Sequence, residues 1–428
     1  MKRFYRILYS TILVYLLSVA FVIGALFSPK TMSALLGRFG LWVRYRKNLP
    51  QKTNKKRIWF HVSSAGELEQ AKPLIRLFYE RDKEKVEIIL TYFSPSAVKP
   101  ASNIPGVLFS DYLPLDTYFS TKHIFNLIDP DAVVFVKFDI WPNIVWEAEQ
   151  RGIHTFLIDG TLHRKSMRYS NFIGQSFYNS VYMSFNMIGV VSASDLKRFI
   201  ITSPKHDNVK ILGDTRFDQV AFRASQNDPR KLPMSMQEYK DKLTVICGST
   251  WDADDKHIMK PLRDLLEDVS LLNLILVPHE PTPKRIQKYI EYFAAYAPVK
   301  LSEIRKGAKG GRVVLVDEVG CLAEIYRIAS VAYVGGAFST GVHNVMEPSI
   351  MGLPTIFGPF YYNSPEAEAL VRNNCAFSGS NSEYFYSCFK KLACDSAFRI
   401  ESGKKAQDFI QSSLGADEKY YKEISKAL

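Results

Sequence analysis

A carboxylate follows the first predicted strand in the body of this chain. The apolar run at 58–62 is typical of a buried strand, and it leads through Ser63 and Ser64 to Glu67. A carboxylate at the carboxyl end of a parallel strand could act as a general base. The same residues could instead start a helix that a serine caps and whose positive end Glu67 favours. Taken alone, they favour this structural role.

A second carboxylate, Asp139, follows the run at 131–136 and stands beside Trp141 and Pro142. Because neighbouring parallel strands end at one edge of a sheet, Glu67 and Asp139 could share one cleft. Alternatively, Asp139 only caps a helix that Pro142 opens. Both roles stay open on the residues alone.

A glycine-rich loop follows a predicted strand in the second half of the chain. Gly335 and Gly336 begin it, Gly341 lies within it, and Glu347 follows near the start of a predicted helix. Glycines let backbone amides approach a phosphate, and a helix N-terminus adds partial positive charge. Glu347 could accept hydrogen bonds from ribose hydroxyls. The loop is neither a P-loop nor a compact G-x-G-x-x-G, which argues against a kinase or a dehydrogenase.

Short apolar runs alternate with helical stretches in two halves of the chain, which is the rhythm of parallel βαβ units. The runs lie at 58–62, 86–92, 131–136, 154–158 and 187–191, and then at 243–247, 272–277, 312–316, 331–336 and 353–358. This pattern predicts an α/β protein with two Rossmann-like domains that face each other across a cleft.

The expected boundaries follow from charge and from Pro-containing polar segments. They are a membrane anchor and basic linker at 1–57, an N-terminal domain at 58–222, a linker at 223–240 and a C-terminal domain at 241–428. The linker is expected because the polar stretch without strand pattern contains Asp228-Pro229 and Leu232-Pro233.

The basic charge of the chain is confined to its N-terminus. The net charge is +12, yet residues 1–57 hold 12 Lys and Arg and no acid, so the rest is neutral. A neutral body argues against nucleic acid as a partner. The five cysteines show no Cys/His ligand spacing, which indicates a reducing compartment and buried thiols rather than a metal site.

Residues 8–27 form an uncharged, mostly apolar stretch, long enough to cross a bilayer core of about 30 Å. Basic residues flank it and are more numerous after it, which by the positive-inside rule places the body in the cytoplasm. A cleaved signal peptide is the alternative, but the run is long and no clear A-x-A site follows. A helix that lies in the membrane interface is a variant of the anchor.

The basic tract at 30–57 begins with Lys30, ends with Arg57 and could be a solvated linker. Near an anionic membrane, each Lys or Arg contributes about 1 kcal/mol of attraction, and Trp42 and Tyr45 are types that favour the interface. We therefore expect the tract to contact the anionic lipid surface and to hold a phosphorylated lipid near Glu67.

The order of motifs resembles the 3-deoxy-D-manno-octulosonic acid (Kdo) transferases of lipopolysaccharide biosynthesis. Residues 64–67 match S-V-G-E and residues 137–143 match E-T-E-L-W-P-N, and the resemblance covers essentially the whole chain. It implies a GT-B fold at the bacterial inner membrane and an inverting transfer of Kdo from the donor CMP-Kdo to lipid IVA, without metal or cofactor. It also implies that Glu67 is the general base and that Asp139 replaces a supporting glutamate.

The resemblance further implies which residues bind the donor. They are Arg216 in G-x-L-K-F-D, Ser249 and Thr250 in S-T-H-E-G-E-E, Pro278 and His279 in P-R-H-P-E-R, Asp317 and Gly320 in G-D-x-x-G-E-L, and Gly341, His343, Asn344 and Glu347 in G-G-H-N-x-x-E. The leaving phosphate is expected to contact Arg216 and the amides of residues 335–344. Lys137, Trp251 and Cys321 depart from the family pattern, which indicates a divergent branch.

Two other functions fit the same features. A different membrane-bound GT-B enzyme that uses a UDP-sugar would share the folds and the anchor, and a donor screen would distinguish it. A noncatalytic lipid-binding relative would explain the altered motif positions, and it would bind lipid without forming a product.

Overall fold

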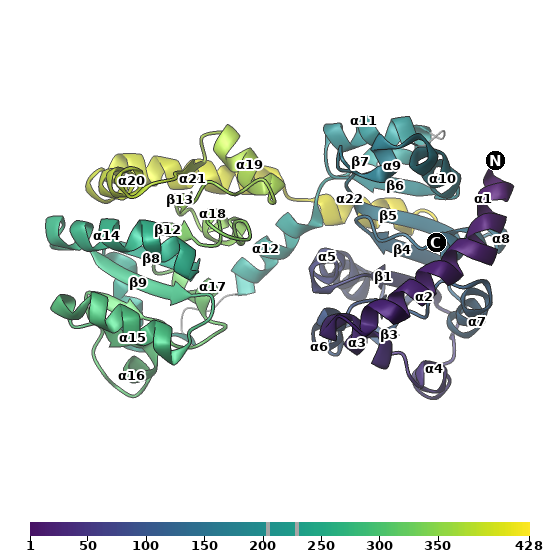
Figure 1. The fold of residues 1–428 in the computed structure, drawn as a ribbon, viewed down its shortest axis with the longest axis horizontal. Helices are drawn as coiled ribbons and strands as arrows, with labels where there is room; N and C mark the ends of the chain where they lie inside the picture. Colours follow the sequence, from purple (N-terminus) through teal and green to yellow (C-terminus); the bar gives the residue numbers. More distant parts are fainter. Residues whose placement is uncertain (203–205, 227–230) are drawn as a thin grey trace. The chain divides into compact units, whose positions relative to one another are not determined.

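The computed structural model describes residues 1–202, 206–226 and 231–428 (Figure 1). The chain divides into two compact units, one of Met1–Gln219 with Leu414–Leu428 and one of Val220–Ser413. Each unit is built on a parallel sheet of seven strands, which confirms the prediction of two α/β domains.

The sheet of the first unit has the strand order β3-β2-β1-β4-β5-β6-β7. Its strands are β1 (Lys56–Val62), β2 (Val86–Tyr92), β3 (Val107–Tyr112), β4 (Ala132–Val136), β5 (His154–Gly160), β6 (Met187–Val190) and β7 (Val209–Ile211). The helices that follow them include α5 (Ala65–Asp82), α7 (Tyr118–Ile128), α8 (Pro142–Gln150), α10 (Phe172–Tyr182) and α11 (Ala193–Thr202). Strands β1 and β4 are neighbours, so their carboxyl ends meet at one edge.

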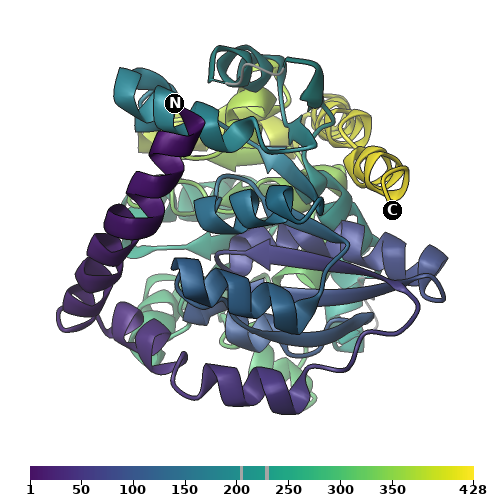
Figure 2. The same ribbon diagram turned by 90° about the vertical axis from the view of Figure 1, so that its right-hand side faces the viewer.

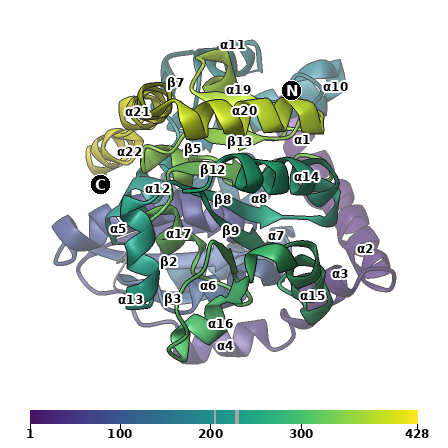
Figure 3. The ribbon, with the colours of Figure 1, turned by 90° about the vertical axis from the view of Figure 1, so that its left-hand side faces the viewer.

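The second unit repeats this design with the order β10-β11-β9-β8-β12-β13-β14 (Figure 3). Its strands are β8 (Thr244–Thr250), β9 (Asn273–Pro278), β10 (Val299–Lys300), β11 (Val313–Leu315), β12 (Val331–Val334), β13 (Thr355–Phe357) and β14 (Ala376–Ser378). Its helices include α14 (Asp252–Asp268), α15 (Pro283–Tyr292), α16 (Leu301–Arg305), α17 (Leu322–Tyr326), α18 (Met346–Ile350), α19 (Pro365–Arg372), α20 (Ser382–Cys394) and α21 (Ser396–Ser412).

The apolar N-terminal stretch is helical over Lys2–Ala25 and is long and apolar enough to cross a membrane. It consists of α1 (Lys2–Leu8), a π-helical turn η1 (Tyr9–Leu13) and α2 (Val14–Ala25). The helix contacts the first unit along most of its length, from the ion pair of Lys2 with Glu149 (2.5 Å) to the ring contact of Phe21 with Phe93 (5.4 Å between centroids). Figure 2 shows it lying along the side of that unit.

Two expected boundaries differ from the structure. Of the predicted linker, Asp228 and Pro229 lie outside the described residues, but Leu232, Met236 and Tyr239 are buried in the core of the second unit. The last helix, α22 (Ala416–Ser425), belongs to the first unit and not to the C-terminal domain. The reason is its apolar face, because Tyr420 and Ile424 are buried in the core of the first unit.

Tyr420 fastens α22 with a buried hydroxyl that accepts a hydrogen bond from the backbone N–H of Asp159 (2.8 Å). We expect Tyr420→Phe to lower the free energy of unfolding of the first unit by about 1–3 kcal/mol, because that N–H loses its acceptor. Urea unfolding measures the loss. Tyr421→Phe is the matched control, since its hydroxyl bonds Asp82 in a partly exposed place that water can enter. Equal losses in both variants would contradict the prediction.

Candidate functional site

Glu67 lies in the first turn of α5, directly after the end of β1, and only 8% of its surface is exposed. Ser64 occupies the N-cap position, but its side chain caps no helix amide and donates to the Glu67 carboxylate instead. The serine therefore orients the carboxylate. The position of Glu67 at the positive end of the helix fits the role of stabilising the helix start. The bond from Ser64 to the carboxylate is not part of that role, because Ser64 caps no helix amide.

Asp139 follows β4 and accepts hydrogen bonds from His61 Nε2 (3.1 Å) and Trp141 Nε1 (3.2 Å). Burial raises the pKa of Asp139, but the hydrogen bonds from His61, Ser63 and Trp141 outweigh burial and hold this pKa below its usual value. Asp139 is therefore an anion at neutral pH. Ser63 bonds Asp139 and Ser64 bonds Glu67, so two consecutive serines bring both carboxylates to one sheet edge.

A buried chain of hydrogen bonds holds the ring of His61 behind Asp139. Thr91 Oγ1 accepts from Trp59 Nε1 (2.8 Å), so its own hydrogen can point to His61 Nδ1 (2.9 Å). His61 Nε2 faces Asp139 Oδ2 (3.1 Å) and also accepts from Trp141 Nε1 (2.9 Å), so the three side chains form one hydrogen-bonded cluster. The sequence interpretation assigned no role to His61. The available signal was one polar residue inside the otherwise apolar run at 58–62.

Arg216 lies at the start of α12 (Thr215–Gln226), where its guanidinium bonds the carboxylate of Asp214 (2.7 Å). Its charge is thus partly balanced within the protein. Nearby, burial and then the charge of Asp214 raise the pKa of Asp159 well above its usual value. The structure therefore places Arg216 in a polar network of the first unit.

The glycine-rich loop of the second unit packs tightly against the end of β8. Asp254 anchors the loop because its carboxylate accepts from the N–H of Gly336 (2.9 Å) and the hydroxyl of Tyr333 (2.9 Å). At Gly341, with a φ of +110°, a Cβ would lie 2.4 Å from the Asn363 side chain. Only glycine fits here.

Several amides of this loop are engaged within the protein. Those of Gly335, Gly336, Gly341, Val342 and His343 donate to Gly248, Asp254, Gly336, Phe360 and Gly335 respectively. The predicted phosphate cradle from these amides is therefore not preformed. A phosphate would need other donors, such as the exposed side chain of Asn344, or a rearranged loop.

Three aromatic rings gather beside the loop. His279, at the end of β9, stacks on Trp251 (4.5 Å between centroids) and on His343 (4.6 Å). Trp251 Nε1 donates to His343 Nε2 (2.7 Å), and burial together with His279 lowers the pKa of His343. Trp251 departs from the family pattern, and here it is part of a flat aromatic surface.

The other predicted donor residues have mixed surroundings. Ser249 has a φ of +53° at the end of β8, and buried Thr250 lies 3.3 Å from Tyr289 Oη. Pro278 is buried at the end of β9, and Gly320 is exposed.

The two predicted acids have partners within the protein. Asp317 accepts from the backbone N–H of Ser302 (3.0 Å), which stabilises the start of α16. Glu347 pairs with Arg223 (3.7 Å).

Five of the nine cations in the basic tract at 30–57 pair with acids of the first unit. Arg57 is 1% exposed and pairs with Glu87 (2.5 Å), and Arg44 pairs with Asp111 (2.7 Å). Lys52, Lys55 and Lys56 also have acidic partners. The expected open cationic surface is therefore reduced, since acids that lie later in the chain fold against it, while Lys30, Arg46 and Lys47 stay exposed without an ion pair to any described residue.

Among the residues that the structure describes, the cysteines and acidic groups offer no arrangement typical of a metal centre. Within the described residues, no three His, Cys, Asp or Glu side chains gather as metal ligands. Cys247, Cys321 and Cys375 are buried as expected, whereas Cys394 is exposed. Burial raises the pKa of Cys321 to about 11, which keeps this thiol protonated.

Two solved structures share the fold over most of their length. UDP-GlcNAc 2-epimerase from Neisseria meningitidis has a TM-score of 0.62 and 12% identity, covering 87% of this chain and 99% of its own. MurG from Acinetobacter baumannii has a TM-score of 0.55 and 12% identity, with the same coverage. Together with the two parallel sheets, these likenesses define the GT-B fold class.

Sequence relatives indicate a family within that class. A family model described as 3-deoxy-D-manno-octulosonic-acid transferase (kdotransferase) matches residues 35–219. The Kdo transferase of Haemophilus influenzae is 26% identical, covering 79% of this chain and 78% of its own. That of Aquifex aeolicus is 28% identical, covering 77% and 84%. The chain is therefore similar to Kdo transferases over most of its length, and these relatives support a glycosyltransferase.

Proposed function

We propose that this protein transfers Kdo from CMP-Kdo to lipid IVA at the cytoplasmic face of the bacterial inner membrane. The observation that carries the proposal is the pair of carboxylates at one sheet edge, Glu67 and Asp139, in a chain whose relatives are named Kdo transferases. The exposed apolar N-terminal helix supports a place at the membrane.

In this reaction Glu67 takes the proton from the acceptor hydroxyl. The hydroxyl oxygen bonds carbon 2 of Kdo while the bond from carbon 2 to the phosphate oxygen of CMP breaks, and attack from the opposite face inverts the configuration. Asp139 stays anionic beside Glu67 and stabilises positive charge that develops on the sugar. Asn344, His343 and Glu347 would contact the nucleotide.

We propose no metal or cofactor, so EDTA should leave the rate unchanged.

Mass spectrometry of lipid IVA incubated with CMP-Kdo and the protein tests the proposal. We expect a product heavier by one or more Kdo residues, and no product with UDP-sugars. Transfer from a UDP-sugar would assign the chain to another GT-B activity. Intact lipid binding without any product would support the noncatalytic relative.

Gly341→Ala tests the nucleotide part of the site. We expect the Kd for CMP to rise by about tenfold, because the new methyl group collides with Asn363 and displaces the loop that carries His343. Isothermal titration calorimetry measures the change. Gly307→Ala is the matched control, since Gly307 has a similar φ of +102° with nothing within 4 Å of its Cβ position. An unchanged Kd in Gly341→Ala would remove this loop from the nucleotide site.

A further inference from the structure

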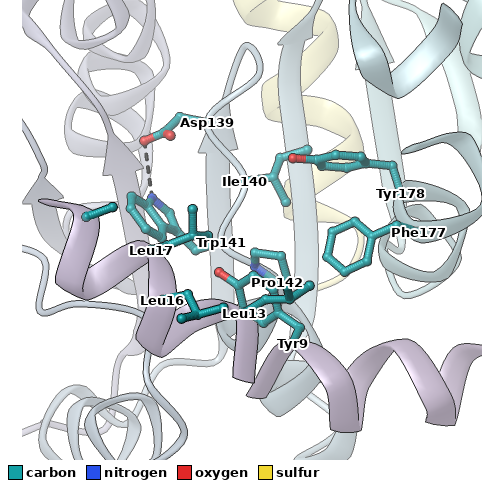
Figure 4. A pocket seen from close by; sticks show the side chains of 11 residues that line it. Tyr9, Leu13, Leu16, Leu17, Asp139, Ile140, Trp141, Pro142, Phe177 and Tyr178 are labelled. Atoms are coloured by element: carbon teal, nitrogen blue, oxygen red, sulfur yellow. Dashed lines mark hydrogen bonds between the residues drawn. The ribbon is translucent and has the colours of Figure 1, made fainter. Parts of the chain in front are cut away.

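An open pocket of about 590 Å³ lies in the first unit between the N-terminal helix and the segment that follows β4 (Figure 4). One wall comes from the helix, with Leu13, Leu17 and Ala20. The opposite wall comes from Trp141 and from Phe177 in α10. The pocket is thus assembled from segments far apart in the sequence, and no motif predicted it.

The walls of this pocket are mainly apolar, but one of its lining residues is Asp139. Figure 4 shows the Asp139 carboxylate next to the indole of Trp141, with a hydrogen bond between them. The pocket therefore runs from an apolar wall of the helix to a group of the proposed reaction site. A ligand that fills it needs an apolar part next to a polar part.

Polar contacts from the π-helical turn hold the helix in this place. Tyr9 donates to the buried carboxylate of Asp116 (3.1 Å), and Ser10 donates to Asn143 Oδ1 (2.5 Å). Asp116 also accepts the N–H of Asn143 (2.9 Å), which belongs to the first turn of α8. These hydrogen bonds connect the helix to the segment that carries Trp141. They therefore fix the two walls of the pocket relative to each other.

The pocket opens toward a surface suited to lipid. Leu16 and Leu17 line it and are 61% and 60% exposed, and they continue into exposed apolar residues of the same helix. Apolar groups of this kind are stable when they contact hydrocarbon, at about 0.8 kcal/mol for each buried CH₂ group. This continuity favours an acyl chain as the occupant.

Cations lie next to the apolar pocket on the same helix. A second pocket of about 920 Å³ is lined by Lys2, Arg3 and Arg6 together with hydroxyl side chains. Lys2 pairs with Glu149, whereas Arg3 and Arg6 form no ion pair with any residue in the described ranges. An apolar pocket beside unpaired cations matches an amphiphile that carries phosphate as well as acyl chains.

We propose that the apolar pocket receives one acyl chain of the phosphorylated lipid acceptor and thereby sets the acceptor sugar beside Asp139. This inference rests on the proposed function and adds the part of the protein that recognises the lipid. The phosphate of the same lipid then lies toward Arg3 and Arg6.

Filling the pocket tests this inference. Ala20→Phe adds a ring at an exposed lining position, and Val19→Phe is the control, because Val19 is 56% exposed on the same helix and lines neither pocket. We expect Ala20→Phe to raise the KM for lipid IVA about tenfold and to leave the KM for the fully deacylated acceptor unchanged. Val19→Phe should change neither. An equal rise for both acceptors, or no rise, would overturn the proposal.

A binding experiment separates this proposal from the reaction itself. Lipid IVA with a brominated acyl chain should quench the fluorescence of Trp141, and Ala20→Phe and Trp141→Phe should both lose that quenching while Val19→Phe keeps it. Quenching without any Kdo transfer would sink the proposed function and keep the acyl site. Equal quenching by brominated phosphatidylglycerol would assign the pocket to bulk membrane lipid and overturn its role for the acceptor.

Discussion

Replacing Glu67 by Gln is expected to lower kcat for Kdo transfer by about 100- to 10,000-fold, the usual contribution of a general base. Gln has the same shape and can still accept the hydrogen bond from Ser64, but it cannot take up a proton. We therefore expect an unchanged Kd for CMP and an unchanged midpoint of unfolding. A coupled assay of CMP release, at saturating acceptor, measures kcat.

Glu69→Gln is the matched control for this experiment. Glu69 lies two residues further along α5, where it pairs with Lys72 (2.5 Å) and accepts from Gln219 (3.0 Å). We expect its kcat to stay within about twofold of the wild type, because Glu69 takes no part in the proposed reaction and loss of a half-buried ion pair to Lys72 costs little. A Glu67→Gln enzyme that stays folded and transfers Kdo at the wild-type rate would remove Glu67 from the role of base.

Arg57→Met is expected to lower the free energy of unfolding of the first unit by about 3–5 kcal/mol, because it leaves the buried Glu87 carboxylate without its cationic partner. Urea unfolding measured by tryptophan fluorescence follows this unit, which holds Trp42, Trp59, Trp141 and Trp146. The double variant Arg57→Met with Glu87→Leu should recover most of the loss, because no unpaired charge then remains buried.

The pH dependence of this loss has a defined sign. Burial raises the pKa of Glu87, but hydrogen bonds from Thr53 and Arg57 outweigh burial and lower this pKa in the folded protein. The wild type therefore gains stability from Glu87 above the carboxylate's ordinary pKa of 4.5 and loses it as pH falls through the lowered value.

In Arg57→Met, loss of the hydrogen bonds and charge of Arg57 raises the pKa of Glu87 above its wild-type value, so the deficit should shrink as the pH falls and Glu87 becomes protonated. A stable Arg57→Met protein with weaker lipid use would instead restore Arg57 to the lipid-binding surface that its sequence position suggested. A deficit that grows as the pH falls would show that another group controls it.

The apolar runs in the sequence predicted the central strands of both sheets to within a few residues. The four strands that they missed are β3, β7, β10 and β14, and each lies at the edge of its sheet. Central parallel strands are covered on both faces and therefore appear as continuous apolar runs. Edge strands such as β7 and β10 are short and partly exposed, so their sequences lack that signal.

The acidic partners of the basic tract show what local sequence could not reveal. Arg44 and Arg57 look alike within a run of positive charge, yet each is bound by an acid 67 or 30 residues further along the chain. Strand pairing between β1 and β2 places Glu87 opposite Arg57. Such a pairing depends on register between distant segments, and a charge count does not contain it.

The sequence by itself determined that the chain folds as two α/β units, that its motifs resemble those of Kdo transferases, and that Glu67 and Asp139 follow strand ends. These features depend on local apolar runs and on the order of motifs. Both can be recognised in the sequence without knowing which distant residues are in contact. Only the tertiary structure decided which cations remain unpaired, that α22 returns to the first unit, and that His61 orients Asp139. It also decided where an acyl chain could enter, because pockets and buried charges arise from contacts between residues far apart in the chain.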